Sequence, residues 1–297
     1  MQDSSSAEST RDASLTGDLY IYNPSTHHTA FESNPSHPNV LIFLSGQTEG
    51  PLHPPYLFTL SSTLAKHSYS LVQPILSSSY LGFGYSSLDD DVKEIGILVE
   101  YLKRERGKSG KIVLMGHSTG AQITLHFLRT SPLSSQVSAG ILQAPVSDRE
   151  YMVWKGPESV NKWLPIAEKF ITEGKGDEFL PREAYSTPIT SARYASLTST
   201  NLTLTLDDYF SSDLPTDHIK ALFSPAQPLL ILLSGSDEYV PPHVDPTKLL
   251  QKWMSIRAEM RRVTFGVVIN GADHTCSGRE EGEVICGWVE ECLEFVG

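Results

Sequence analysis

The residues best suited to chemistry lie at 116–120, where the chain reads Gly-His-Ser-Thr-Gly. This pattern stands between an apolar run at 111–115, typical of a buried strand, and a segment at 119–129 with helical spacing of its apolar residues. A serine hydroxyl is a weak nucleophile until a base removes its proton, and a sharp strand-to-helix turn, relieved by glycines, presents it to such a base. The sequence therefore predicts that Ser118 is a nucleophile.

A base and an acid follow Ser118 along the chain, each after an apolar run that predicts a strand. Asp237 lies in the first of these loops and His274 in the second. The carboxyl ends of parallel strands meet at one edge of a sheet, so we expect the three side chains to lie together. His274 is expected to accept the proton of Ser118, while Asp237 orients the imidazole and stabilises its charge. Glu238 is the competing acid; Asp237 is favoured because its shorter carboxylate directly follows the strand turn.

Attack of the hydroxyl on a carbonyl creates an oxyanion, which is usually stabilised by two backbone N–H groups. The N–H of Thr119, the residue after the nucleophile, is one expected donor. The second is expected in the loop that follows the apolar run at 40–44, with Gln47 as the first candidate. A simple tight turn at Gly46 is the alternative interpretation of this loop.

The elements that must position these residues alternate between strand and helix patterns. Strands are predicted at residues 19–22, 29–32, 40–44, 69–76, 111–115, 137–143, 229–233 and 264–269. Helices are predicted at residues 57–66, 89–107, 119–129, 247–260 and 281–295. This alternation predicts a mostly parallel central sheet flanked by helices. Together with a serine at a strand-to-helix turn, it is typical of the α/β-hydrolase fold.

One long segment interrupts the alternation. Residues 147–224 carry tryptophans, prolines and scattered charges without a strand pattern, and we interpret them as an inserted, partly helical cap. Residues 1–17 are polar and lack an apolar core, which predicts a disordered tail rather than a signal peptide. A single domain is therefore expected at residues 18–297.

Composition limits the partners of this chain. Its formal net charge of -12 disfavours nucleic acid and anionic membranes, and no run of 18 apolar residues predicts a membrane span. The three cysteines cluster near the C-terminus, which is typical of a reducing compartment. Neither they nor His27 and His28 have the spacing of zinc ligands. Serine-based hydrolysis needs no metal or organic cofactor, and the sequence leaves the oligomeric state open.

Four stretches together resemble a fungal and plant α/β-hydrolase family that was long classed as a domain of unknown function. They are the motif at 116–120, Thr-Pro-Ile-Thr at 187–190, Asp-Asp-Tyr-Phe-Ser-Ser-Asp-Leu at 207–214 and Ser-Gly-Ser-Asp-Glu-Tyr-Val-Pro at 234–241. The resemblance implies an intracellular, cytoplasmic siderophore esterase that cleaves ornithine esters of fusarinine-type iron carriers. Iron would then arrive as part of a ferric siderophore substrate.

Fusarinine-type molecules carry free amines, which carboxylates attract. We hypothesise that Asp207, Asp208 or Asp213, in the expected cap, pairs with these amines; solvated carboxylates or helix caps are the alternative. Two other functions stay open. One is a general carboxylesterase or lipase-like hydrolase of another small ester, and the other is a non-catalytic protein that uses the same fold to bind a ligand.

Overall fold

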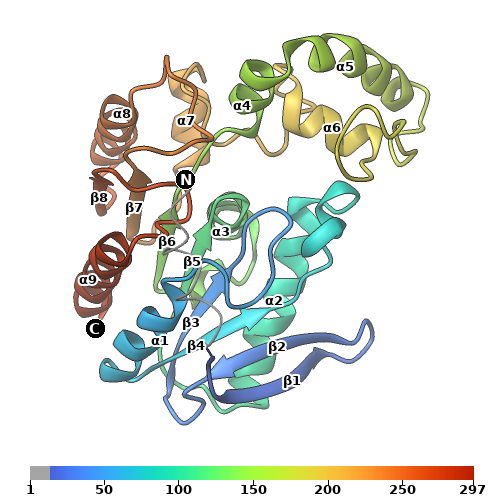
Figure 1. Ribbon diagram of the computed structural model, residues 1–297. Helices are drawn as coiled ribbons and strands as arrows, with labels where there is room; N and C mark the ends of the chain where they lie inside the picture. The colour runs from blue at the N-terminus through green and yellow to red at the C-terminus, as the bar shows by residue number, and fades with distance from the viewer. Residues whose placement is uncertain (1–13) are drawn as a thin grey trace, which may run out of the picture.

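The computed structural model describes residues 14–297, which form an eight-stranded sheet in the order β1-β2-β4-β3-β5-β6-β7-β8 (Figure 1). The strands are β1 Gly17–Asn23, β2 His28–Ser33, β3 Asn39–Leu44, β4 Tyr69–Pro74, β5 Ile112–His117, β6 Ala139–Gln143, β7 Leu229–Ser234 and β8 Thr264–Ile269. β1 pairs with β2 and β2 with β4 in antiparallel fashion, and all the other neighbours are parallel. The predicted mostly parallel sheet is confirmed.

Helices cover both faces of this sheet. The described residues form the helices α1 Leu57–Lys66, α2 Leu88–Arg104, α3 Thr119–Thr130, α4 Asp148–Lys155, α5 Pro157–Thr172, α6 Ser191–Thr198, α7 Thr216–Leu222, α8 Pro246–Glu259 and α9 Arg279–Val296, with short 3-10 turns at Tyr80–Gly84 and Ser134–Gln136. α1 and α9 pack on one face, and α2, α3 and α8 pack on the other. The predicted helices flanking the sheet are therefore present.

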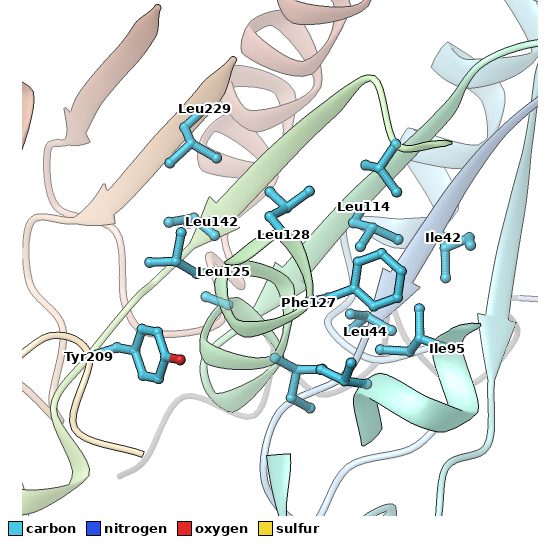
Figure 2. Packing of buried hydrophobic residues seen from close by; sticks show 14 of the residues in the cluster. Ile42, Leu44, Ile95, Leu114, Leu125, Phe127, Leu128, Leu142, Tyr209 and Leu229 are labelled. Atoms are coloured by element: carbon cyan, nitrogen blue, oxygen red, sulfur yellow. The ribbon is translucent and has the colours of Figure 1, made fainter. Parts of the chain in front are cut away.

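The core explains why the central strands are apolar along their whole length. In β3, Leu41 and Phe43 face the α1 and α9 side, whereas Ile42 and Leu44 face the α2 and α3 side. Side chains of a strand alternate between faces, so a strand buried on both faces carries apolar residues at successive positions. Figure 2 shows the second of these layers, in which leucines of neighbouring strands pack against α3 around Phe127.

The segment between β6 and β7 has two parts. Trp163 of α5 and Tyr194 of α6 belong to an apolar cluster separate from the two clusters on the sheet. Phe210 and Phe223, by contrast, belong to the core of the sheet. In Figure 1, α4, α5 and α6 accordingly form a group beyond one edge of the sheet, while α7 lies beside α8. Of the segment expected at residues 147–224, only the first part stands apart from the sheet.

The N-terminal boundary also differs from the expectation. Of the tail expected at residues 1–17, residues 1–13 lie outside the described part of the chain. β1 begins at Gly17, which pairs with Ser33. This strand therefore starts two residues before the run at 19–22 that predicted it. Across residues 14–297, no helix has both the length and the apolarity needed to cross a membrane.

Candidate active site

The turn between β5 and α3 places Ser118 in a constrained position. Ser118 has φ 54 and ψ -120, a conformation that is costly for a residue with a side chain. Gly116 and Gly120 make the turn possible: a Cβ on Gly116 would overlap the carbonyl of Gly120, and a Cβ on Gly120 would overlap the carbonyl of Leu44. The close approach of β3, β5 and α3 therefore depends on these two glycines.

Two loops at the carboxyl ends of β7 and β8 bring Asp237 and His274 together. The Nδ1 atom of His274 lies 2.8 Å from Oδ2 of Asp237, and both side chains are almost fully buried. The second oxygen of Asp237 accepts a hydrogen bond of 2.9 Å from the backbone N–H of Tyr239. Glu238 instead accepts a hydrogen bond of 3.0 Å from the backbone N–H of His274. Asp237 thus contacts the imidazole ring, whereas Glu238 holds the loop.

A cavity of about 410 Å³ opens at this edge of the sheet, and Ser118, His274 and Gln47 all line it. Its other lining residues are Thr48, Glu49, Val146, Ser147, Asp148, Tyr151, Met152, Tyr185, Ser186 and Tyr239. Thr119 begins α3 immediately after Ser118 and is buried. Of the residues expected to form the catalytic triad and the oxyanion hole, Ser118, His274 and Gln47 line one cavity, while Asp237 contacts it through His274 and Thr119 adjoins Ser118.

Glu49 supports the loop that carries Gln47. One carboxylate oxygen accepts a hydrogen bond of 2.8 Å from the backbone N–H of Gly46, and the other lies 2.9 Å from Nδ1 of His53 and 3.4 Å from Nε2 of His117. Burial raises the pKa of Glu49, but the two neighbouring imidazoles outweigh burial and hold this pKa well below its ordinary value. Glu49 was not predicted from the sequence as a functional residue, since its only signal is its place two residues after Gln47.

Gln143, the last residue of β6, joins the two sides of the site. Its side-chain oxygen lies 2.5 Å from Nδ1 of His117 and accepts a hydrogen bond of 3.1 Å from the hydroxyl of Tyr56. Its amide nitrogen donates to the backbone carbonyl of His274 over 3.2 Å. Burial lowers the pKa of His117, which favours a neutral ring beside His274. The side chain of Gln143 thus holds both His117, the residue before the nucleophile, and the loop that carries His274.

The three aspartates considered for substrate binding lie outside the residues that line this cavity. Asp207 forms a buried ion pair with Arg193. Asp208 lies 2.6 Å from Nε of Arg149, and Asp213 pairs with the same guanidinium. These ion pairs connect α4 and α6 to the segment that follows α6. Each carboxylate that was expected to bind a substrate amine is therefore already paired with an arginine of the chain.

Metal-ligating side chains that come together within residues 14–297 are His67, Glu290 and Glu294, whose ligand atoms lie within 4.8 Å of one another. They belong to α9 and the residue after α1, on the face of the sheet that those helices cover, and none of them lines the cavity. Partly exposed acidic groups often lie together without an ion, and no step of ester hydrolysis by a serine needs one.

The sheet order, the strained serine and the paired histidine and aspartate define an α/β-hydrolase. Residues 7–296 match the family described as a protein of unknown function (DUF1749), and the chain belongs to this family. It is 31% identical to the fusarinine C esterase sidJ of Aspergillus fumigatus, over 83% of this chain and 85% of the relative.

Two further comparisons agree with this assignment. The chain is 31% identical to esterase AN6793 of Emericella nidulans, over 87% of this chain and 84% of the relative. Its fold is similar to that of the siderophore hydrolase EstB from Aspergillus fumigatus, with a TM-score of 0.79, 28% identity, and coverage of 96% of this chain and 99% of that one. The protein is therefore an ester-hydrolysing enzyme.

Proposed function

We propose that the protein is a serine esterase that cleaves ornithine ester bonds of a fusarinine-type hydroxamate siderophore. The observation that carries the proposal is the strained Ser118 in one cavity with His274, whose ring is held by Asp237. Relatives named as a fusarinine C esterase and a siderophore hydrolase support the choice of substrate.

The proposed reaction begins with the hydroxyl of Ser118. His274 accepts the hydroxyl proton at Nε2, and the oxygen attacks the ester carbonyl. Asp237, 2.8 Å from Nδ1, fixes the tautomer that leaves Nε2 free and stabilises the imidazolium that forms. The backbone N–H groups of Thr119 and Gln47 donate hydrogen bonds to the oxyanion, whose oxygen carries a negative charge that is absent from the ester.

Collapse of the tetrahedral intermediate breaks the bond to the alcohol. His274 returns its proton to the leaving oxygen, and the acyl group stays on Ser118. A water molecule, deprotonated by the same imidazole, then attacks the acyl group, and the imidazolium returns this proton to Oγ of Ser118 as the acid leaves. Proton transfer requires a neutral imidazole at the start, so the rate should fall as His274 becomes protonated.

The room for a large substrate extends beyond the cavity. A groove of about 430 Å³ adjoins it and shares Tyr151, Met152, Tyr185 and Ser186 with its lining. Together they can hold an ester with a bulky group on one side of the scissile bond. We propose that α4, α5 and α6, which stand apart from the sheet, act as the cap over this space.

We also propose that the enzyme works in the cytoplasm. Cys276, Cys286 and Cys292 are all buried and unpaired with one another. Burial raises the pKa of each thiol to about 11, which keeps them protonated and unreactive. Free, inert thiols are typical of proteins that fold in a reducing compartment.

Comparing the protein with its Ser118→Ala variant tests this proposal. Fusarinine C is incubated with each, and ester cleavage to the linear monomer is followed by mass spectrometry. Removal of the nucleophile should lower kcat by about 10⁴-fold or more, because the remaining groups cannot replace covalent catalysis. Cleavage that persists in the variant would refute the role of Ser118, and an intact substrate with both proteins would refute the substrate.

A general carboxylesterase is the second candidate, and the modest volume of the cavity, about 410 Å³, favours it. A panel of p-nitrophenyl esters of increasing acyl length separates the two candidates. Turnover of short esters without cleavage of fusarinine C would favour the general esterase. Tight binding of an ester that is never hydrolysed would favour a ligand-binding protein instead.

A further inference from the structure

We propose that Asp148 makes the cavity selective for esters that carry a protonated amine near the scissile bond. The inference rests on the proposed serine esterase activity and names the chemical class of its substrate. Asp148 is the first residue of α4, follows the N-cap Ser147, and lines the same cavity as Ser118 and His274. It differs from the three aspartates that the sequence suggested for this role.

The cavity has an unbalanced negative charge. Among the described residues, Glu49 and Asp148 are the acids that line it, and no lysine or arginine does. Glu49 accepts a hydrogen bond from Gly46 on one oxygen, and two imidazoles lie within 3.4 Å of the other. Asp148 forms no ion pair with a residue of the lining; burial raises its pKa, although the charge of the buried Arg193, which is paired with Asp207, acts to lower it.

The surroundings of Asp148 leave room for a donor. One of its oxygens accepts a hydrogen bond of 2.9 Å from the amide nitrogen of Gln122, while no hydrogen bond from residues 14–297 reaches the other. Gln122 is buried, and its own side-chain oxygen has no hydrogen-bond partner among the described residues. The second oxygen of Asp148, which belongs to a residue of the lining, thus lacks a donor, and an ammonium group supplies three.

The rest of the lining also suits a cation. Tyr151, one turn after Asp148 on α4, has its ring centroid 4.9 Å from that of Tyr239, which lies 4.6 Å from the ring of His274. Tyr185 lines the same space. The faces of aromatic rings attract cations, so an ammonium held by Asp148 gains from this wall as well.

Catalysis gives a second reason for a cationic substrate. The oxyanion that forms near Thr119 is destabilised by any uncompensated negative charge in the same cavity. Burial raises the pKa of Asp148, which reflects the cost of that charge when no cation is bound. An ammonium group on the substrate compensates Asp148 and removes the repulsion in the transition state.

The test uses two ethyl esters of N5-acetylornithine that differ only at the α-amino group, free in one and acetylated in the other. Reactions are run at pH 6.5, below the ~7.7 expected for an α-amino group. The wild type should prefer the free-amine ester by about tenfold in kcat/KM, because a charge-assisted hydrogen bond adds to its binding. Asp148→Asn should abolish this preference, mainly by raising KM for the free-amine ester, and should increase kcat/KM for the acetylated ester because the negative charge beside the oxyanion is gone.

Asp217→Asn is the matched control, because it removes the same charge from an exposed position on α7. It should retain the wild-type preference for the free-amine ester. If this control loses the preference as Asp148→Asn does, the preference depends only on net charge and the assignment to Asp148 is overturned. An Asp148→Asn variant that still prefers the free amine would also overturn it. Turnover of the acetylated ester reports the hydrolase activity separately: if the wild type cleaves the acetylated ester but not the free-amine ester, the esterase stands and the amine preference fails.

Discussion

At the scale of single residues, Glu49 shows how a charge outside the triad can control its geometry. The carboxylate holds the backbone of Gly46 on one side and approaches His117 on the other. A Cβ built on Gly46 would lie 3.1 Å from Cβ of Ser118, so this loop passes directly beside the nucleophile. We therefore regard Glu49 as a positioning residue that sets the distance between the oxyanion loop and Ser118.

Glu49→Gln should lower kcat about tenfold while KM stays nearly constant. An amide keeps the size of the side chain but weakens the hydrogen bond to Gly46 and the attraction to the imidazoles. The oxyanion loop is then held less well, which lowers stabilisation of the transition state and leaves substrate binding nearly unchanged. Steady-state kinetics on a simple ester measures the split. Glu183→Gln, an exposed acid in the adjoining groove, is the charge control. A change confined to KM would show that Glu49 binds substrate rather than positioning the loop.

Whether the role of a residue can be predicted from the sequence depends on how far along the chain its partners lie. Ser118, Asp237 and His274 are visible in the sequence because each follows a strand and local turn chemistry marks its position. Asp148 and Glu49 owe their roles to neighbours far along the chain, such as Gln122 and His117, and no local pattern records those contacts. The role of Asp207 was misjudged for the same reason, since its partner Arg193 is supplied by folding.

At the scale of elements, the start of α2 combines two kinds of acid. Asp89, Asp90 and Asp91 lie in the first turn of α2, at the positive end of its helix dipole. Asp90 is exposed, but Asp91 is buried and accepts a hydrogen bond of 2.6 Å from Ser78. Burial raises the pKa of Asp91 to about 7, so its ionised form is costly inside the fold.

Asp91→Asn should stabilise the protein at alkaline pH. A carboxyl whose pKa is raised by folding contributes stability that is complete below its unfolded pKa of about 3.9 and is lost as pH rises to about 7. The variant does not titrate, so its free energy of unfolding relative to wild type should be about 2 to 3 kcal/mol more favourable at pH 8 than at pH 5. Urea unfolding at the two values measures this difference. Asp90→Asn, its exposed neighbour, should show no such gain, and equal behaviour of the two variants would contradict the explanation.

Elements with a repeating pattern could be predicted, and those without one could not. The strands β3, β5 and β7 each carry a continuous apolar run because both faces are covered, which makes them visible in the sequence. α4 and α6 are only 8 residues each and pack mainly on α5 and on each other, so their apolar positions follow no long period. Their existence was anticipated as a partly helical cap, while their bounds depend on tertiary packing.

At the scale of the whole molecule, the formal net charge of -12 surrounds a cavity that itself lacks lysine and arginine among the described residues. The summed field of the protein and the local field of Asp148 therefore have the same sign. Fields of this kind raise the local concentration of oppositely charged ligands and weaken when salt screens them.

Salt should therefore affect the two ornithine esters differently. Raising the ionic strength from about 0.01 M to about 0.15 M shortens the screening length from about 30 Å to about 8 Å. We expect kcat/KM for the free-amine ester to fall severalfold and that for the acetylated ester to stay nearly constant. Initial rates of both esters over this range provide the measurement, and parallel declines would point to a general effect of salt on the enzyme.

The apolar cluster within α5 and α6 is separate from the core of the sheet, so evolution can change the one without changing the other. Trp163 and Tyr194 pack with their own neighbours rather than with the strands that end at Ser118. A lineage can therefore rebuild the cluster and its helices without repacking the sheet beneath the nucleophile. Descendants of one ancestral hydrolase can in this way inherit the same chemistry unchanged while diverging in the esters they accept.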